Sequence, residues 1–157
     1  MPKKLAFLSH SLSETTQFGN KLGKILKAGD VVLLNGELGA GKTALAKGIS
    51  KGLGLKSARY VVSPSYSIIN EYNAKIKIYH FDLYRIATLD EFYGLGAHEY
   101  FNSSGVCLVE WGDKFANAIP KKRLEILLEH TGEKERKITI TAFGKRYEEI
   151  VKGLNNL

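Results

Sequence analysis

The spacing of apolar residues in the first third of the chain predicts strands that alternate with helices. Residues 1–10 predict an opening strand. Residues 13–27 carry apolar side chains at helical intervals, with Ser13 as the N-cap and Gly29 beyond the end of the helix. The predicted inner face of this helix consists of Phe18, Leu22, Ile25 and Leu26.

A buried strand and a helix are predicted next. Residues 31–34 form a continuous apolar run, and residues 43–51 have helical spacing with Leu45 and Ile49 on the inner side. After this helix, residues 63–65 predict a loop, because the proline at their centre interrupts strand pairing.

The middle of the chain predicts a hairpin followed by two short helices. Apolar and polar residues alternate over 66–72 and 75–81, on either side of a turn at Asn73 and Ala74. Residues 88–91 have the form of a capping box and predict the start of one short helix, and residues 97–101 predict another.

The last third predicts three strands and a closing helix. Residues 106–110 form an apolar run that ends in Glu110, as is typical of a parallel strand buried on both faces. Residues 124–129 and 136–142 predict two strands joined by a short turn, and a helix begins near Lys145. Because early strands are separated by helices and later strands by turns, we expect a mixed sheet.

The octapeptide at residues 36–43 fits the pattern G-x-x-x-x-G-K-[ST] and lies between the predicted buried strand and helix, which is the context that this motif requires. Its glycines allow the backbone to curl until successive N–H groups point into one concavity around a phosphate chain. Lys42 would reach the β- and γ-phosphates, and Thr43 would offer its hydroxyl to Mg²⁺. The alternative, an ordinary glycine-containing turn, is disfavoured by this context.

Two acidic residues end predicted strands, where ligands of α/β sheets gather. They are Glu110 and Asp82. A P-loop NTPase needs a carboxylate that holds Mg²⁺ directly or through water. The sequence does not rank the two by itself; we assign Glu110 to Mg²⁺ and Asp82 to the outer shell or to orienting the attacking water, although Asp82 could instead pair with Arg85.

Two further residues lie near these acids in the sequence. Ser65 belongs to the loop between the P-loop helix and Asp82, where nucleotide-sensing switches are found, so it is a candidate nucleotide contact. His80 precedes Asp82 by two residues and is interpreted as a structural histidine.

Length and composition favour a single domain over residues 1–157. The predicted fold class is α/β: a single P-loop NTPase-like domain with a mixed, largely parallel central sheet flanked by helices. The one cysteine, Cys107, lies in an apolar run, which predicts a buried thiol and favours a reducing cytoplasm. The N-terminal apolar run is too short for a signal peptide or a membrane span, so no membrane association is expected.

The formal net charge of +7 is unevenly distributed. Residues 82–113 contain six acidic residues and no lysine or arginine except Arg85, whereas basic clusters occur at Lys21, Lys24 and Lys27, at residues 121–123 and at residues 134–137. A basic surface attracts nucleic acid or an acidic protein patch. Each cluster by itself is more typical of a surface that keeps a small protein soluble, and no known nucleic-acid-binding motif accompanies them.

Three alternative functions can be compared with the motifs. A small-molecule kinase would also carry an early P-loop, but it usually needs an arginine-rich lid, and the arginines of this chain are few and spread out. A GTPase is disfavoured because the chain contains no Asn-Lys-x-Asp string. A nucleotide-gated binding module with negligible turnover stays open as an alternative.

The motifs taken together resemble the TsaE family, formerly YjeE, over about residues 13–120. The resemblance rests on the strings at residues 36–43, 63–66, 80–85 and 107–111. It implies a small bacterial ATPase that uses ATP and Mg²⁺ and works with the TsaB and TsaD proteins to form threonylcarbamoyladenosine next to the anticodon of tRNA. In that setting the ATPase drives or resets the cycle of the assembly, and its contact with tRNA is indirect or weak.

The same resemblance implies roles for individual residues. Thr43 and Glu110 serve Mg²⁺, Asp82 belongs to the hydrolytic centre with Lys42 and Glu110, and the stretch around Leu12 and Ser13 borders the adenine. The phosphate contacts would come from Glu37, Leu38, Gly39, Ala40, Gly41, Lys42 and Thr43.

The chain departs from the family pattern at one position and matches it less well after another. Ser65 stands where the family usually has threonine, so the hydroxyl is kept and a methyl group is lost. Beyond Pro120 the resemblance fades, and Arg136 is a candidate match to an arginine of the closing hairpin.

Overall fold

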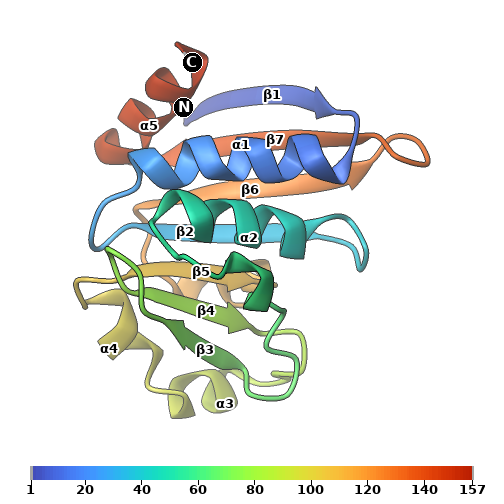
Figure 1. Ribbon diagram of the computed structural model, residues 1–157. Coiled ribbons are helices and arrows are strands. Elements are labelled where there is room, and N and C mark those ends of the chain that lie inside the picture. Colours follow the sequence, from blue (N-terminus) through green and yellow to red (C-terminus); the bar gives the residue numbers. More distant parts are fainter. Residues whose placement is uncertain (1, 157) are drawn as a thin grey trace.

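The computed structural model describes residues 2–156, which form a seven-stranded sheet with helices packed on it (Figure 1). The strands are β1 (Lys3–Ser9), β2 (Val31–Gly36), β3 (Ile69–Tyr72), β4 (Ile78–Asp82), β5 (Val106–Glu110), β6 (Arg123–His130) and β7 (Arg136–Phe143). The α-helices are α1 (Leu12–Ile25), α2 (Lys42–Gly52), α3 (Leu89–Gly94), α4 (Ala97–Phe101) and α5 (Lys145–Asn155), and the 3₁₀ segments are η1 (Ala58–Tyr60) and η2 (Gly112–Ala118).

The strand order is β1-β7-β6-β2-β5-β4-β3. The central pairs β6–β2, β2–β5 and β5–β4 are parallel, and the outer pairs β1–β7, β7–β6 and β4–β3 are antiparallel. The predicted mixed sheet with a parallel centre is therefore confirmed. Its parallel strands β2, β4 and β5 all end at the same edge, which is where the chemistry-bearing residues gather.

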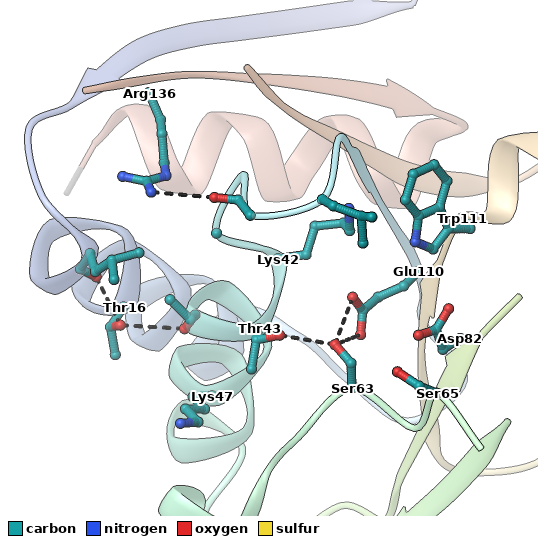
Figure 2. Close-up of a pocket in the computed structure, with 15 residues that line it drawn as sticks. Thr16, Lys42, Thr43, Lys47, Ser63, Ser65, Asp82, Glu110, Trp111 and Arg136 are labelled. Carbon is teal, nitrogen blue, oxygen red and sulfur yellow. Dashed lines mark hydrogen bonds between the residues drawn. The ribbon is translucent and has the colours of Figure 1, made fainter. Parts of the chain in front are cut away.

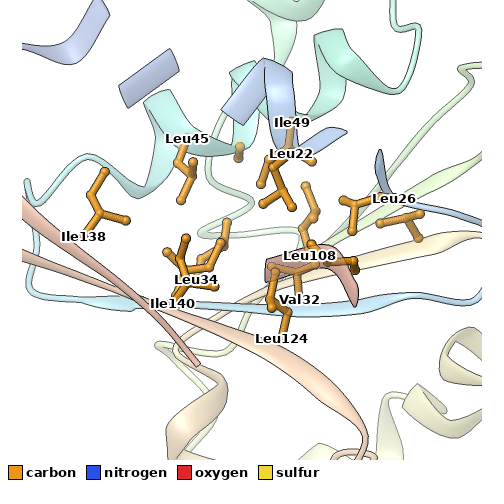
Figure 3. Packing of buried hydrophobic residues seen from close by; sticks show 14 of the residues in the cluster. Leu22, Leu26, Val32, Leu34, Leu45, Ile49, Leu108, Leu124, Ile138 and Ile140 are labelled. Carbon is orange, nitrogen blue, oxygen red and sulfur yellow. The ribbon is translucent and has the colours of Figure 1, made fainter. Parts of the chain in front are cut away.

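Alternation along β2 explains why the sheet is covered on both faces. Val32 and Leu34 point into a core shared with α1, α2 and α5, whereas Val31 and Leu33 point into a second core shared with α3, α4 and η2. Figure 3 shows the first core, with leucine and isoleucine side chains of the helices packed against those of the strands. Each fully buried side chain of this size stabilises the fold by about 1.5–3 kcal/mol, so these two layers fix the central strands.

Helices α1 and α2 lie side by side on the same face of the sheet (Figure 1), and they touch through glycines. A Cβ on Gly19 would lie 2.7 Å from the carbonyl oxygen of Leu45, and one on Gly48 would overlap the carbonyl oxygen of Thr16. Gly23 and Gly52 repeat this contact one turn further along each helix. The helix that begins at the P-loop is thus held at backbone distance from α1.

Predicted boundaries are wrong at the start of α1 and in the hairpin, whose second strand, β4, begins at Ile78 and not at residue 75. Helix α1 is capped by Ser11 and not by Ser13: the Ser11 hydroxyl accepts a 3.1 Å hydrogen bond from the Glu14 amide, and Glu14 accepts a 2.7 Å bond from the His10 amide. The pair Ser11 and Glu14 has the three-residue spacing of a capping box, which was a usable sequence signal. Strand β3 begins at Ile69 instead of residue 66, because the chain after the proline loop turns through Ile68 in a left-handed conformation with φ 69°.

Among residues 2–156, no helix combines the length and the apolar character needed to cross a lipid bilayer.

Candidate nucleotide-binding site

The P-loop connects the end of β2 to the start of α2, and its glycines adopt conformations that other residues avoid. Gly39 has φ 78° and Gly41 has φ 106°, both in the left-handed region. Gly36 has φ 148°, and a Cβ there would lie 2.6 Å from the carbonyl oxygen of Leu128 on the neighbouring strand β6. Glycine at these positions therefore follows from the curl of the loop and from its close packing on the sheet.

The loop is braced from behind by Arg136, the first residue of β7. Its side chain is buried, and its Nε donates a 2.7 Å hydrogen bond to the carbonyl oxygen of Ala40. A second nitrogen, Nη2, donates to the carbonyl oxygen of Gly39 at 3.5 Å. By occupying these carbonyls, the guanidinium helps to fix the loop in its curled shape.

Lys42 lies under the same loop. Its ammonium group donates to the carbonyl oxygens of Gly36 and Glu37, the latter at 3.0 Å, and sits 4.3 Å from the centre of the Trp111 ring. Burial lowers the pKa of Lys42, while the negative charges of Glu110, Asp82 and Asp113 act in the opposite direction. Trp111 reaches this position because the chain leaves β5 with φ 61°, a left-handed conformation that is rare for residues other than glycine.

A chain of hydrogen bonds joins the start of α2 to the end of β5 (Figure 2). The hydroxyl oxygens of Thr43 and Ser63 are 2.9 Å apart, and the Ser63 hydroxyl lies 3.0 and 3.2 Å from the two oxygens of the Glu110 carboxylate. On its other side, Glu110 Oε2 is 2.6 Å from Nε2 of the buried His80. Glu110 is consequently held by a hydroxyl and an imidazole at the edge of the sheet.

Asp82 ends β4 directly opposite Glu110, because the two residues are in register across the parallel β4–β5 pair. Its side chain is buried, and its carboxylate accepts a 3.0 Å hydrogen bond from the Tyr84 amide. Burial raises the pKa of Asp82, the bond from Tyr84 acts to lower it, and the nearby charge of Glu110 raises it again. The structure therefore places two carboxylates of different environment side by side, with no ion pair between Asp82 and Arg85.

These groups line a cavity of about 540 Å³ next to the P-loop. The cavity brings together most of the residues predicted from the sequence: Leu12, Leu38, Gly39, Gly41, Lys42, Thr43, Ser65, Asp82 and Glu110. Glu37 and Ala40 do not line it; they face a second hollow on the other side of the loop. Ser65 is exposed, and Leu12 is 52% exposed at the rim.

The cavity also contains residues to which the sequence assigned no role in the site. Thr16, Ala44, Lys47, Ser63, Trp111 and Arg136 complete its lining. Thr16 lies four residues after Leu12, and Lys47 lies four residues after Thr43, so helical spacing could have placed both beside the site. Of the two serine hydroxyls in the proline loop, that of Ser63 joins Thr43 to Glu110.

Comparison with known proteins identifies relatives along most of the chain. Residues 9–138 match the family model described as "Threonylcarbamoyl adenosine biosynthesis protein TsaE". Curated proteins named "tRNA threonylcarbamoyladenosine biosynthesis protein TsaE" are 42% identical over 154 residues in Bacillus subtilis (98% of this chain, 95% of that protein) and 36% identical over 133 residues in Treponema pallidum (85% and 97%).

A solved structure supports the same relationship. The crystal structure of Bacillus subtilis YdiB superposes with a TM-score of 0.81 at 38% sequence identity, and the match covers 99% of this chain and 97% of the other. The fold of this chain is thus that of a solved structure.

Proposed function

Because the chain belongs to the TsaE family, we propose that it binds and hydrolyses ATP with Mg²⁺ as a component of threonylcarbamoyladenosine biosynthesis in tRNA. The observation that carries this proposal is the convergence of Lys42, Thr43, Asp82 and Glu110 on one cavity beside a curled, glycine-containing loop. The hydrolytic turnover is proposed to be weak and to increase when the TsaB and TsaD proteins are bound.

The P-loop supplies the binding contacts for the triphosphate. Backbone N–H groups of the loop and the N-terminus of α2 provide hydrogen-bond donors and a positive dipole. Lys42 adds a charge that is already held in place by the carbonyls of Gly36 and Glu37. Because its position is fixed in advance, little side-chain entropy is lost when a phosphate oxygen approaches.

The residues present fit a magnesium ion that is shared with the phosphates. Among residues 2–156 there is no group of three or more histidine, cysteine and acidic side chains that could hold a metal by themselves. Mg²⁺ prefers oxygen ligands, and it is usually held by one or two carboxylates together with substrate phosphates. Thr43 and Glu110 offer such oxygens within one hydrogen-bonded set, with Ser63 between them. When bound, the cation would neutralise charge on the β- and γ-phosphates.

Asp82 is proposed to orient the attacking water. It lies next to Glu110 on the neighbouring strand, and burial raises the pKa of its carboxyl group, which suits a group that accepts hydrogen bonds from water near the phosphates. Ser65 and Leu12 are proposed as nucleotide contacts at the rim, with Leu12 beside the adenine.

Calorimetry with MgATP tests nucleotide binding. Replacing Lys42 with alanine removes the charge paired to the phosphates and should weaken ATP binding by about ten- to a hundredfold. Lys51→Ala, an exposed lysine on the same helix, is the matched control and should bind ATP normally. Unchanged affinity of Lys42→Ala for MgATP would rule out the proposed phosphate-binding site.

Phosphate release tests the hydrolytic roles. Glu110→Ala should lower the rate of Mg²⁺-dependent ATP hydrolysis and retain much of the affinity for ATP. An unchanged rate of hydrolysis in that variant would indicate that Asp82, and not Glu110, holds the metal. Each variant should be assayed alone and with TsaB and TsaD. A small-molecule kinase would instead consume ATP only with an acceptor molecule and would not respond to these partners.

A further inference from the structure

A row of basic side chains extends from α1 across α2 to the loop that follows it. We define the basic face as Lys21, Lys24, Lys51, Lys56 and Arg59, all of which are exposed. Two adjoining hollows of about 330 and 600 Å³ lie along it, and Lys51 lines both. The first hollow is lined only by polar and basic residues, namely Thr16, Gln17, Asn20, Lys21, Lys24 and Lys51.

The charges of this face are not neutralised by neighbours. Within residues 2–156, none of the five cations forms an ion pair with a carboxylate, whereas Lys77, Arg123 and Arg146 do. Residues 15–66 contain only two acids, Asp30 and Glu37. Asp30 is buried against Arg146, and Glu37 lines the hollow that it shares with Ala40 on the other side of the P-loop. Neither acid therefore offsets the charge of the basic face. An uncompensated row of this kind suits a polyanion.

An aromatic side chain stands beside one of these cations and narrows the class of polyanion. The Arg59 guanidinium lies 4.9 Å from the ring centre of Tyr60, which is 64% exposed. Nucleic-acid bases stack on such rings and on arginine planes, whereas an acidic protein surface gains little from them.

We propose that the basic face binds RNA directly, with its lysines on the phosphate backbone and with Tyr60 stacking on an unpaired base. The face adjoins the nucleotide cavity, since Thr16 lines both the cavity and the first hollow. This inference goes beyond the proposed function, because RNA binding by this face requires neither ATP nor hydrolysis. RNA is favoured over DNA only by the pathway named for the relatives, so a DNA of equal length is included in the test.

Fluorescence anisotropy with a labelled, unmodified tRNA anticodon stem-loop tests the proposal without nucleotide. The test variant combines Lys21→Gln, Lys24→Gln, Lys51→Gln and Lys56→Gln. The control variant removes the same charge from exposed lysines outside the basic face, through Lys3→Gln, Lys4→Gln, Lys121→Gln and Lys122→Gln. The affinity of the test variant for the stem-loop should fall by about tenfold or more, whereas that of the control should fall by no more than about twofold. A plot of log K against log salt concentration should also be less steep for the test variant, by about 3 in its slope.

A second pair of variants separates stacking from charge. Tyr60→Ala should weaken binding of the stem-loop by about fivefold or more, and Tyr93→Ala, at another exposed tyrosine, should not. Three results would overturn the proposal: equal losses in the test and control variants, no binding by the wild-type chain at about 0.1 M salt, or displacement by polyglutamate as effective as by RNA of equal charge. Tighter binding of the DNA would assign the face to DNA. Calorimetry with MgATP on the same variants keeps a failure of RNA binding distinct from a failure of the nucleotide site.

Discussion

The imidazole of His80 lies 2.6 Å from the carboxylate of Glu110, and both side chains are removed from solvent. An ionised carboxylate only accepts hydrogen bonds, so Nε2 of His80 must carry the proton that joins them. The other ring nitrogen, Nδ1, then has no partner among the described residues. A buried histidine with one unsatisfied nitrogen is more costly than an apolar residue, which points to a role in orienting Glu110.

Replacing His80 with alanine should therefore impair the metal step more than nucleotide binding. We expect the Mg²⁺ concentration for half-maximal ATP hydrolysis to rise by about tenfold or more, because partners that orient a metal ligand have effects of this size. His80→Gln, which keeps an N–H donor, should recover part of the loss. His98→Ala, at an exposed histidine, is the control. If His80→Ala lowers the thermal stability of the protein but leaves the Mg²⁺ concentration for half-maximal hydrolysis unchanged, His80 has only a structural role.

Arg136 supplies the second prediction, because it connects the last hairpin to the P-loop. Arg136→Gln should weaken ATP binding by about tenfold, since the carbonyls of Ala40 and Gly39 lose a charged donor and the loop loses its brace. Arg136→Lys should not fully restore binding, because an ammonium cannot reproduce the planar fork.

Arg123 is a matched control for that experiment. Its side chain is partly buried, and it bonds to Glu125 and to the carbonyls of Ala116 and Pro120, away from the P-loop. Arg123→Gln should lower stability without changing ATP affinity. Equal losses of affinity in the two arginine variants, measured by calorimetry, would contradict the proposed brace.

The contact between α1 and α2 gives a prediction about stability. Alanine normally stabilises a helix by about 1 kcal/mol relative to glycine. At Gly48 the sign should reverse, because a Cβ would overlap the backbone of Thr16, and overpacking of this kind costs about 1–3 kcal/mol. Gly94→Ala, in helix α3 with open space around it, should be neutral or slightly stabilising. Urea unfolding of both variants measures the difference, and a stabilised Gly48→Ala would show that the helices separate easily.

Local pattern was sufficient for the parts of the site that follow directly from one strand or helix. The apolar run before Glu110 predicted a strand buried on both faces, and the hairpin pattern delivered Asp82 to the same edge. The two strands are parallel neighbours, and the register of their pairing places the two final acids opposite each other. The glycine pattern likewise predicted the curl between β2 and α2.

The remaining parts depend on pairing between distant segments, which no local pattern encodes. Arg136 reaches Ala40 only because the β6–β7 hairpin lies beside β2 in the sheet. Ser63 and Ser65 were equivalent as hydroxyls on a loop, and the choice between them is made by the path of the backbone after α2. His80 could not be distinguished from a core histidine until its strand was paired with β5.

Cys107 gives a prediction about pH. Burial raises the pKa of its thiol to about 12 from an ordinary value of 9.0, because the thiolate would lose its hydration inside the second core. Above pH 9 the unfolded chain releases this proton while the folded chain retains it. The contribution of the thiol to the free energy of unfolding is therefore fully present below pH 9, and it is lost as the pH rises toward 12. The pKa of Tyr147 is also raised by burial, so it acts in the same direction at high pH.

The free energy of unfolding should accordingly fall between pH 9 and pH 11, with Cys107 contributing a slope of up to about 1.4 kcal/mol per pH unit. Cys107→Ala removes this contribution, so its stability curve should be shallower over that range even if the variant is less stable at neutral pH. Chemical unfolding at a series of pH values measures both slopes. In parallel, the native thiol should resist a disulfide reagent at pH 8 and react fully once the chain is unfolded, because the thiolate is the reactive form. Rapid reaction of the folded protein, or identical alkaline slopes for the two chains, would show that the thiol is not held in a closed core.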